Sequence, residues 1–150
     1  MYDLDREIAG LPFMLELDDY LRSRAVSAIR ATAARAHLPA GTLLFTTSDT
    51  TCNDGYVLVA GNVSIETTEG RTKTVVPTAI LGEMGQFDFD PMHQRAATVH
   101  AEEALEVLHF AWSRLYENMA TTCAPDEIQE FRTALRRYAW LHYMDNQGEL

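Results

Sequence analysis

The stretch GYVLVAGNVSIETTEGRTKTVVPT, residues 55–78, decides which fold to expect. Its pieces are short, rich in β-branched and aromatic residues, and separated by glycine, asparagine or proline, a pattern typical of strands joined by turns. The tetrapeptide EGRT, residues 69–72, has the composition of a hairpin turn between two of these strands. The stretch therefore predicts antiparallel neighbours, not parallel strands connected by crossover helices.

The same pattern of short strand-like runs separated by turn residues continues on both sides of this stretch, from Gly41 to Phe110. Further short runs of this kind are TLLFTT, RAATVHA and ALEVLHFA. Several short strands at regular spacing indicate a sandwich or a barrel. We expect residues 38–111 to form a jelly-roll-like β-roll, a double-stranded β-helix of about eight strands.

Both flanks of this region are expected to be helical. Residues 3–36 contain the alanine-rich run SRAVSAIRATAARA, which favours helix, and Pro12 is expected to divide a short helix from a longer one. Near the other end, Pro125 suits a first helical turn, and the apolar positions that follow step by three and four residues. The fold class is thus mainly β with flanking α. We expect one domain over 1–150, with helices in 1–37, the roll in 38–111 and helices in 112–144.

Charge and composition exclude several classes of function. The chain has 12 Lys and Arg against 22 Asp and Glu, a net charge of −10, so its average field repels nucleic acid and direct DNA binding is not expected. No apolar run is long enough to span a bilayer, and the acidic start does not resemble a signal peptide. Cys52 and Cys123 fit no metal or redox spacing. We therefore expect a cytoplasmic protein with reduced thiols.

Machinery for catalysis is not visible in the sequence. It contains no nucleophile elbow, no glycine-rich phosphate loop with lysine and no cysteine–histidine pair. Asp88, Asp90 and His93 have a poor spacing for a cation site and are interpreted as solvated loop residues. We expect no enzyme, no metal and no cofactor.

Two charged residues stand out in LGEMGQFDFDPMHQRAATVHA, residues 81–101. Glu83 and Arg95 lie in a β-rich segment, where each needs a partner or water. They could form an ion pair, they could be two solvated loop charges, or they could bind a ligand. Ala96 and Ala97 leave room beside Arg95 and offer unobstructed N–H groups, and Gly82 allows a close backbone approach beside Glu83. An arginine fork matches phosphate oxygens, and a carboxylate can accept a hydrogen bond from a ribose hydroxyl.

Three pieces of the chain together resemble the cyclic nucleotide-binding domains of bacterial catabolite activators and of cAMP-dependent kinase regulatory subunits. LPAGTLLFTTSDT is similar to the opening strand of that family. GYVLVAGNVSI is similar to the next conserved stretch, with Gly61 as its turn glycine. LGEMGQF followed by RAATVHA resembles the phosphate-binding cassette, here residues 81–99. The three pieces occur in the family's order, and the resemblance covers nearly the whole chain.

The resemblance implies roles for individual residues. Glu83 matches the glutamate that binds the ribose 2′-hydroxyl, and Arg95 matches the arginine that pairs with the cyclic phosphate. The neighbouring positions that would line the sugar and phosphate are Gly82, Met84, Ala96 and Ala97. Because Ala96 stands where a hydroxyl residue tends to help cGMP, the expected ligand is cAMP, with cGMP as the second possibility.

The last helix has two possible uses. In relatives of this family it often supplies a lid for the base, and Trp140 or Tyr143 could take that part. Alternatively, its apolar stripe could pack on the barrel or form a dimer seam. Since no further domain follows, we expect a sensor that acts in trans on a protein partner or as a homodimer. The competing hypothesis is a degenerate roll that binds no nucleotide and serves as a protein interaction module.

Overall fold

The computed structural model describes residues 3–45, 53–67, 70–83, 87 and 97–146. Its helical elements are α1 (Leu4–Ala9), the 3-10 helix η1 (Met14–Glu16), α2 (Asp19–Thr32), α3 (Trp112–Met119) and α4 (Pro125–Asn146). Its strands are β1 (Ala34–Leu38), β2 (Leu43–Phe45), β3 (Asp54–Ala60), β4 (Val63–Thr67), β5 (Thr72–Val75), β6 (Ala79–Leu81), β7 (Ala97–Ala101) and β8 (Leu105–Ala111).

The strands form two antiparallel four-stranded sheets, which confirms the expected mainly β fold with flanking helices. The first sheet has the order β1-β8-β3-β6 and the second the order β2-β7-β4-β5. Several neighbours in the sheets are far apart in the chain, as the pairing of β8 with both β1 and β3 illustrates. The predicted hairpin is confirmed because β4 pairs with β5, and Gly70 in its turn has a φ of +82°.

Two hydrophobic clusters give the first sheet two apolar faces. The inner cluster lies between the sheets and includes Leu58, Leu105 and Val107. The outer cluster joins the opposite face of the same strands, through Val57 and Phe110, to the helices. Because side chains alternate along a strand, β3 and β8 contribute to both clusters. The first sheet is therefore the middle layer of the molecule.

The expected N-terminal boundary is wrong by several residues. The helix was predicted to reach residue 36, but α2 ends at Thr32 and Ala34 begins β1. All five residues of β1 pair with β8, from Ala34 with His109 to Leu38 with Leu105. This pairing overrides the helix propensity of the alanine-rich run, since propensity is a weak term beside tertiary pairing. The expected division at Pro12 is confirmed, because α1 and α2 are separate helices.

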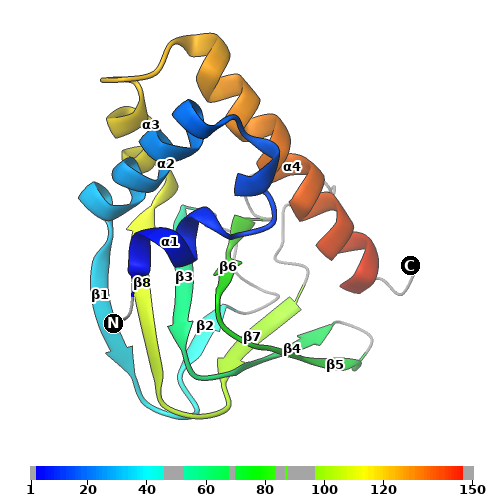
Figure 1. Ribbon diagram of the computed structural model, residues 1–150. Helices are drawn as coiled ribbons and strands as arrows, with labels where there is room; N and C mark the ends of the chain where they lie inside the picture. The colour runs from blue at the N-terminus through cyan, green and yellow to red at the C-terminus, as the bar shows by residue number, and fades with distance from the viewer. Residues whose placement is uncertain (1–2, 46–52, 68–69, 84–86, 88–96, 147–150) are drawn as a thin grey trace.

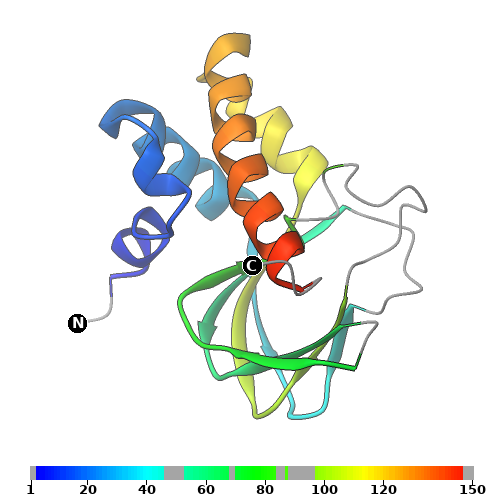
Figure 2. The same ribbon diagram turned by 90° about the vertical axis from the view of Figure 1, so that its right-hand side faces the viewer.

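The helices gather at one end of the roll, as Figure 1 shows, and α4 runs back from there toward the strands. In the turned view of Figure 2 the last turns of α4 come down to the upper edge of the roll. The apolar face predicted for this helix is confirmed, since Phe131 and Leu135 are fully buried. Among the described residues, no helix combines the length and apolar character needed to cross a bilayer.

Candidate functional site

The candidate site begins where β6 ends, at Gly82 and Glu83. Strand β6 pairs with β3, Leu81 opposite Tyr56. Gly82 then turns the chain with a φ of +91°, a conformation that disfavours other residues. A methyl group at Gly82 would overlap the carbonyl oxygen of Asp54 and come within 2.9 Å of the Phe45 ring. Glycine is therefore required both by the backbone conformation and by the close approach of β3.

Glu83 is one of the few buried polar residues among those described, with only 2% of its surface exposed. Its charge acts on Tyr138 of α4. Burial, and then the negative charge of Glu83, raises the pKa of Tyr138 above its ordinary value. The Tyr138 ring also packs against Phe13, with the ring centroids 6.0 Å apart. The carboxylate predicted to bind the sugar thus lies within electrostatic range of the C-terminal helix.

The remaining predicted ligand residues are only partly within the described structure. Met84, Arg95 and Ala96 lie outside the described residues, as do Asp88, Asp90 and His93. Ala97 begins β7, where its backbone pairs with Thr67 of β4. The structure therefore describes the start of the cassette, at Gly82 and Glu83, and the strand β7 that follows the cassette. The distance between Glu83 and Arg95 stays a prediction.

The candidates for a base lid are both in α4. Trp140 is 43% exposed, and Tyr143 lies in the last part of the helix, where only the backbone is described. The sequence favoured these two over Tyr138, the third aromatic residue of this part of the helix. Tyr138 is half-buried, and the negative charge of Glu83 contributes to its raised pKa. Its place in the three-and-four spacing of the helix was the signal that it faces the roll.

A second group of residues near Gly82 was not singled out by the sequence. Asp54, Tyr56 and His109 lie at the same end of the first sheet. The His109 Nε2 is 2.9 Å from a carboxylate oxygen of Asp54, and its ring stacks on Tyr56 with centroids 4.6 Å apart. The Phe45 ring meets Tyr56 edge-on at 5.5 Å. Residues of this kind, paired only through sheet register, leave no signal in a single sequence.

Side-chain contacts fasten α4 to the remainder of the molecule. The Arg132 guanidinium lies over the rings of Phe87 and Tyr116, 5.4 and 4.9 Å from their centroids. Burial, opposed in part by Arg132, raises the pKa of Tyr116 to about 12. Arg137 donates to Glu16 of η1 at 2.7 Å. Phe87 of the cassette segment and Glu16 of η1 therefore both contact α4.

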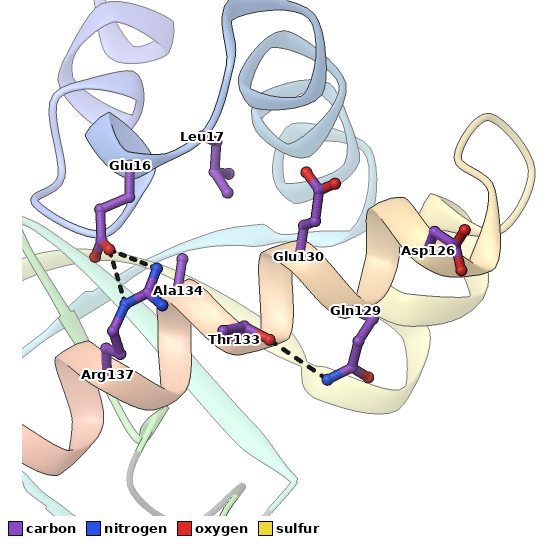
Figure 3. A pocket seen from close by; sticks show the side chains of 8 residues that line it. All are labelled: Glu16, Leu17, Asp126, Gln129, Glu130, Thr133, Ala134 and Arg137. Atoms are coloured by element: carbon purple, nitrogen blue, oxygen red, sulfur yellow. Dashed lines mark hydrogen bonds and ion pairs between the residues drawn. The ribbon is translucent and has the colours of Figure 1, made fainter.

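Two surface pockets flank α4, and neither is lined by Gly82 or Glu83. One, of about 510 Å³, lies between η1 and α4 and is crossed by the Glu16–Arg137 pair, as Figure 3 shows. The other, of about 430 Å³, lies beside Phe87 and carries three arginines of α4, Arg132, Arg136 and Arg137. The predicted sugar-binding carboxylate is therefore distinct from both pockets.

Comparison with known proteins identifies the family of this fold. Residues 35–122 match the family model described as the cyclic nucleotide-binding domain. Among curated proteins no sequence matches the chain.

Solved structures agree in fold at low sequence identity. A candidate cyclic nucleotide-binding protein from Geobacter metallireducens GS-15 is 17% identical, with a TM-score of 0.67 over 95% of this chain and 99% of that one. The N-terminal domain of a transcriptional regulator from Streptomyces coelicolor A3(2) is 23% identical, with a TM-score of 0.64 over 95% and 94%. The regulatory domain of Toxoplasma gondii PKA, crystallised with cAMP, is 19% identical, with a TM-score of 0.59 over 76% of this chain and 42% of that one.

Proposed function

Because the chain belongs to the family of cyclic nucleotide-binding domains, we propose that it binds a cyclic nucleotide and acts as a sensor. The observation that carries this proposal is the position of Glu83. It follows a left-handed glycine at the end of β6, as the cassette pattern requires, and it lies beside Tyr138 of α4. A ligand that engages this carboxylate would therefore act directly on the C-terminal helix.

The proposed chemistry divides the ligand between the two ends of the cassette. Glu83 accepts a hydrogen bond from the ribose 2′-hydroxyl. Arg95 pairs with the cyclic phosphate, helped by the N–H groups of Ala96 and Ala97. Gly82 and Met84 line the sugar. Arginine can hold two phosphate oxygens at once, so the site can bind an anion even though the chain carries a net charge of −10.

The burial of Glu83 supplies the switching step. Since the carboxylate is only 2% exposed, a ligand reaches it only when its cover moves. Tyr138 of α4 lies within electrostatic range of Glu83, so we propose that α4 is part of that cover. A ligand shifts such an equilibrium by its difference in affinity for the two states, typically about 1–3 kcal/mol of coupling. The displaced helix would then act on a protein partner or on a second copy of the chain.

The ligand proposed first is cAMP, and cGMP is the second candidate. The preference rests on Ala96, which offers no hydroxyl to a guanine nucleotide. Trp140 or Tyr143 would close over the base from α4. The side chain of Trp140 is 43% exposed, so part of its surface is accessible to a base.

The test is calorimetric titration of cAMP and cGMP into wild type, Arg95→Ala and Arg114→Ala. Arg114 is an exposed arginine on α3 and is not one of the predicted ligand residues, so its variant removes the same charge outside the cassette. We expect micromolar binding by wild type and Arg114→Ala, and a loss of at least about 2 kcal/mol, roughly thirty-fold in Kd, in Arg95→Ala. Equal binding by all three proteins would refute the assigned role of Arg95.

A protein interaction module that binds no nucleotide is the second candidate function. The observation in its favour is also the burial of Glu83, which is what a carboxylate kept for a structural contact would show. No heat with either nucleotide at millimolar concentration, from a protein that unfolds cooperatively, would favour this second function.

A further inference from the structure

One of the two pockets beside α4, of about 430 Å³, concentrates positive charge. Three arginines line it, Arg132, Arg136 and Arg137. Arg132 and Arg136 are four residues apart, so they are neighbours on one side of the helix. The whole chain has only 12 Lys and Arg against 22 Asp and Glu, so three arginines around one hollow reverse its average charge locally.

The other polar side chains of this pocket are also hydrogen-bond donors. Among the described residues, the lining is completed by Gln129, Thr133 and Phe87, and it includes no carboxylate. The Gln129 amide donates to the Thr133 hydroxyl at 3.4 Å, which leaves the hydroxyl proton able to donate elsewhere. The described lining thus combines positive charge with several donors, as recognition of a small anion requires.

The adjoining pocket, between η1 and α4, has the opposite character. It contains three carboxylates, those of Glu16, Asp126 and Glu130. Arg137 lines both pockets, and Figure 3 shows it paired with Glu16, at 2.7 Å. Its charge is therefore already neutralised, and recognition of an anion falls chiefly to the other two arginines.

Aromatic rings hold Arg132 in position. Its guanidinium lies 5.4 Å from the ring centroid of Phe87 and 4.9 Å from that of Tyr116, within the range of cation–π contacts. An arginine has five N–H donors in the plane of its guanidinium, so contacts with rings do not exhaust them. Because this side chain is half-buried and held, it loses less conformational freedom on binding an anion than an arginine on an open surface does.

Arg136 is exposed and lies one helical turn beyond Arg132, about 6 Å further along the axis. With five donors it can keep its contacts within the chain and still bind an anion. A diphosphate can give each of the two arginines a phosphoryl group of its own, in the bidentate geometry that a guanidinium favours. The hollow is large enough, since small-molecule sites usually measure about 300–1,000 Å³.

We propose that this pocket is a second ligand site, separate from the cassette carboxylate, and that it takes a small molecule with a diphosphate group. Arg132 and Arg136 bind the phosphoryl oxygens, and Gln129 and Thr133 add neutral donors. The inference does not rest on the proposed function, because Glu83 does not line the pocket. The shared chemistry of free pyrophosphate and of a nucleoside diphosphate fits the site, and the experiment distinguishes these two sources.

The experiment is calorimetric titration of the full chain with inorganic phosphate, pyrophosphate and ADP, at fixed ionic strength and without divalent cations. The variants are Arg136→Ala, Arg132→Lys and Arg95→Ala, with Arg6→Ala as control. Arg6 is an exposed arginine of α1 that does not line the pocket, so its variant loses the same charge elsewhere. Arg132→Lys keeps the charge over the rings but removes the fork of donors. Thermal unfolding of each variant verifies that it is folded.

We expect wild type to bind pyrophosphate with a Kd below about 1 mM, and inorganic phosphate about ten-fold more weakly. Arg136→Ala should weaken the binding of pyrophosphate about ten-fold, through the loss of one charge-assisted contact, and Arg132→Lys should weaken it about three-fold or more. Arg6→Ala and Arg95→Ala should stay within about two-fold of wild type.

The ADP titration assigns the ligand within this class. Binding of ADP at least as tight as that of pyrophosphate supports a nucleoside diphosphate as the ligand. Weaker binding of ADP, with pyrophosphate still bound and still sensitive to Arg136→Ala, supports pyrophosphate itself.

Three results would overturn the inference. The first is no heat with pyrophosphate at about 10 mM. The second is a Kd that Arg136→Ala leaves unchanged, or that Arg6→Ala raises equally, since binding would then not depend on the pocket. The third is loss of pyrophosphate binding in Arg95→Ala alone, which would place the anion at the cassette. That third result would agree with the role proposed for Arg95, and the cAMP titrations test that role separately, so the two claims can fail independently.

Discussion

At the scale of single residues, Gly82 connects the geometry of the roll to the candidate site. It combines a left-handed backbone with close contacts to the Asp54 carbonyl and the Phe45 ring. Gly41 has a similar φ, +86°, but a methyl group there would meet nothing within 4 Å. The two positions therefore separate the cost of the conformation from the cost of the contact.

We predict that Gly82→Ala lowers the free energy of unfolding by clearly more than Gly41→Ala does. Both variants bear the conformational cost of about 1–2 kcal/mol for a left-handed residue with a side chain. Only Gly82→Ala also requires β3 to shift, which adds a cost of about 1–3 kcal/mol, typical of overpacking. Urea unfolding of the two variants and wild type measures the difference. Equal destabilisation of the two variants would show that β3 can shift at Asp54 without a measurable cost in free energy.

At the scale of elements, α4 is held chiefly by its apolar face. Phe131 is fully buried and meets Phe13 and Tyr116 edge-on, with centroids 5.6 and 6.3 Å apart. The Arg137–Glu16 pair is exposed by comparison, at 61% and 40% of the two side chains. Exposed ion pairs contribute little, because water already solvates both charges.

We predict that Phe131→Ala destabilises the protein by about 3–5 kcal/mol, through lost burial and the cavity that remains. Arg137→Ala should change the free energy of unfolding by less than about 1 kcal/mol. Denaturant unfolding of both variants tests the contrast. A large effect of Arg137→Ala would mean that the ion pair, and not the apolar face, fixes the helix.

The elements also show where sequence patterns succeed and fail. The hairpin of β4 and β5 and the apolar face of α4 follow from spacings of two and of three and four residues, which are local signals. Strand β1 was missed because its alanine-rich sequence favours helix. Its pairing with β8 joins residues about seventy positions apart, and such long-range pairing is invisible to propensity.

At the scale of the whole molecule, an ion pair joins α2 to α4 across 103 residues of chain. Arg24 contacts Glu127 at 2.7 Å and also donates to the Thr122 carbonyl at 2.6 Å. The Ala124 N–H, and then Arg24, hold the pKa of Glu127 below its ordinary value of 4.5. A carboxyl whose pKa is lowered by folding stabilises the folded state above its unfolded pKa and loses that effect as the pH falls through the folded value.

We predict that the stability difference between wild type and Glu127→Gln is greatest above about pH 4.5 and shrinks as the pH is lowered below it. Glu130→Gln, one turn further along the exposed side of α4, is the matched control. Melting temperatures over a pH series give the comparison. A difference that stayed constant with pH would contradict the assigned role of the Glu127 charge.

The sequence by itself determined the β-roll between helices, and its resemblance to a known family gave the family and a prediction of the cassette residues. It could do so because turn glycines, short β-branched runs and helical spacing are local consequences of backbone geometry. The glutamate after Gly82 could be identified for the same reason, since only a glycine permits that turn.

Tertiary structure alone decided which side chains meet across the sheets. It buries Glu83, places Tyr138 beside it, and stacks His109 on Tyr56 next to Asp54. These contacts join β3, β6, β8 and α4, and they depend on strand register and helix packing, which a one-dimensional pattern does not encode. These contacts are thus properties of the folded chain and not of any local pattern in its sequence.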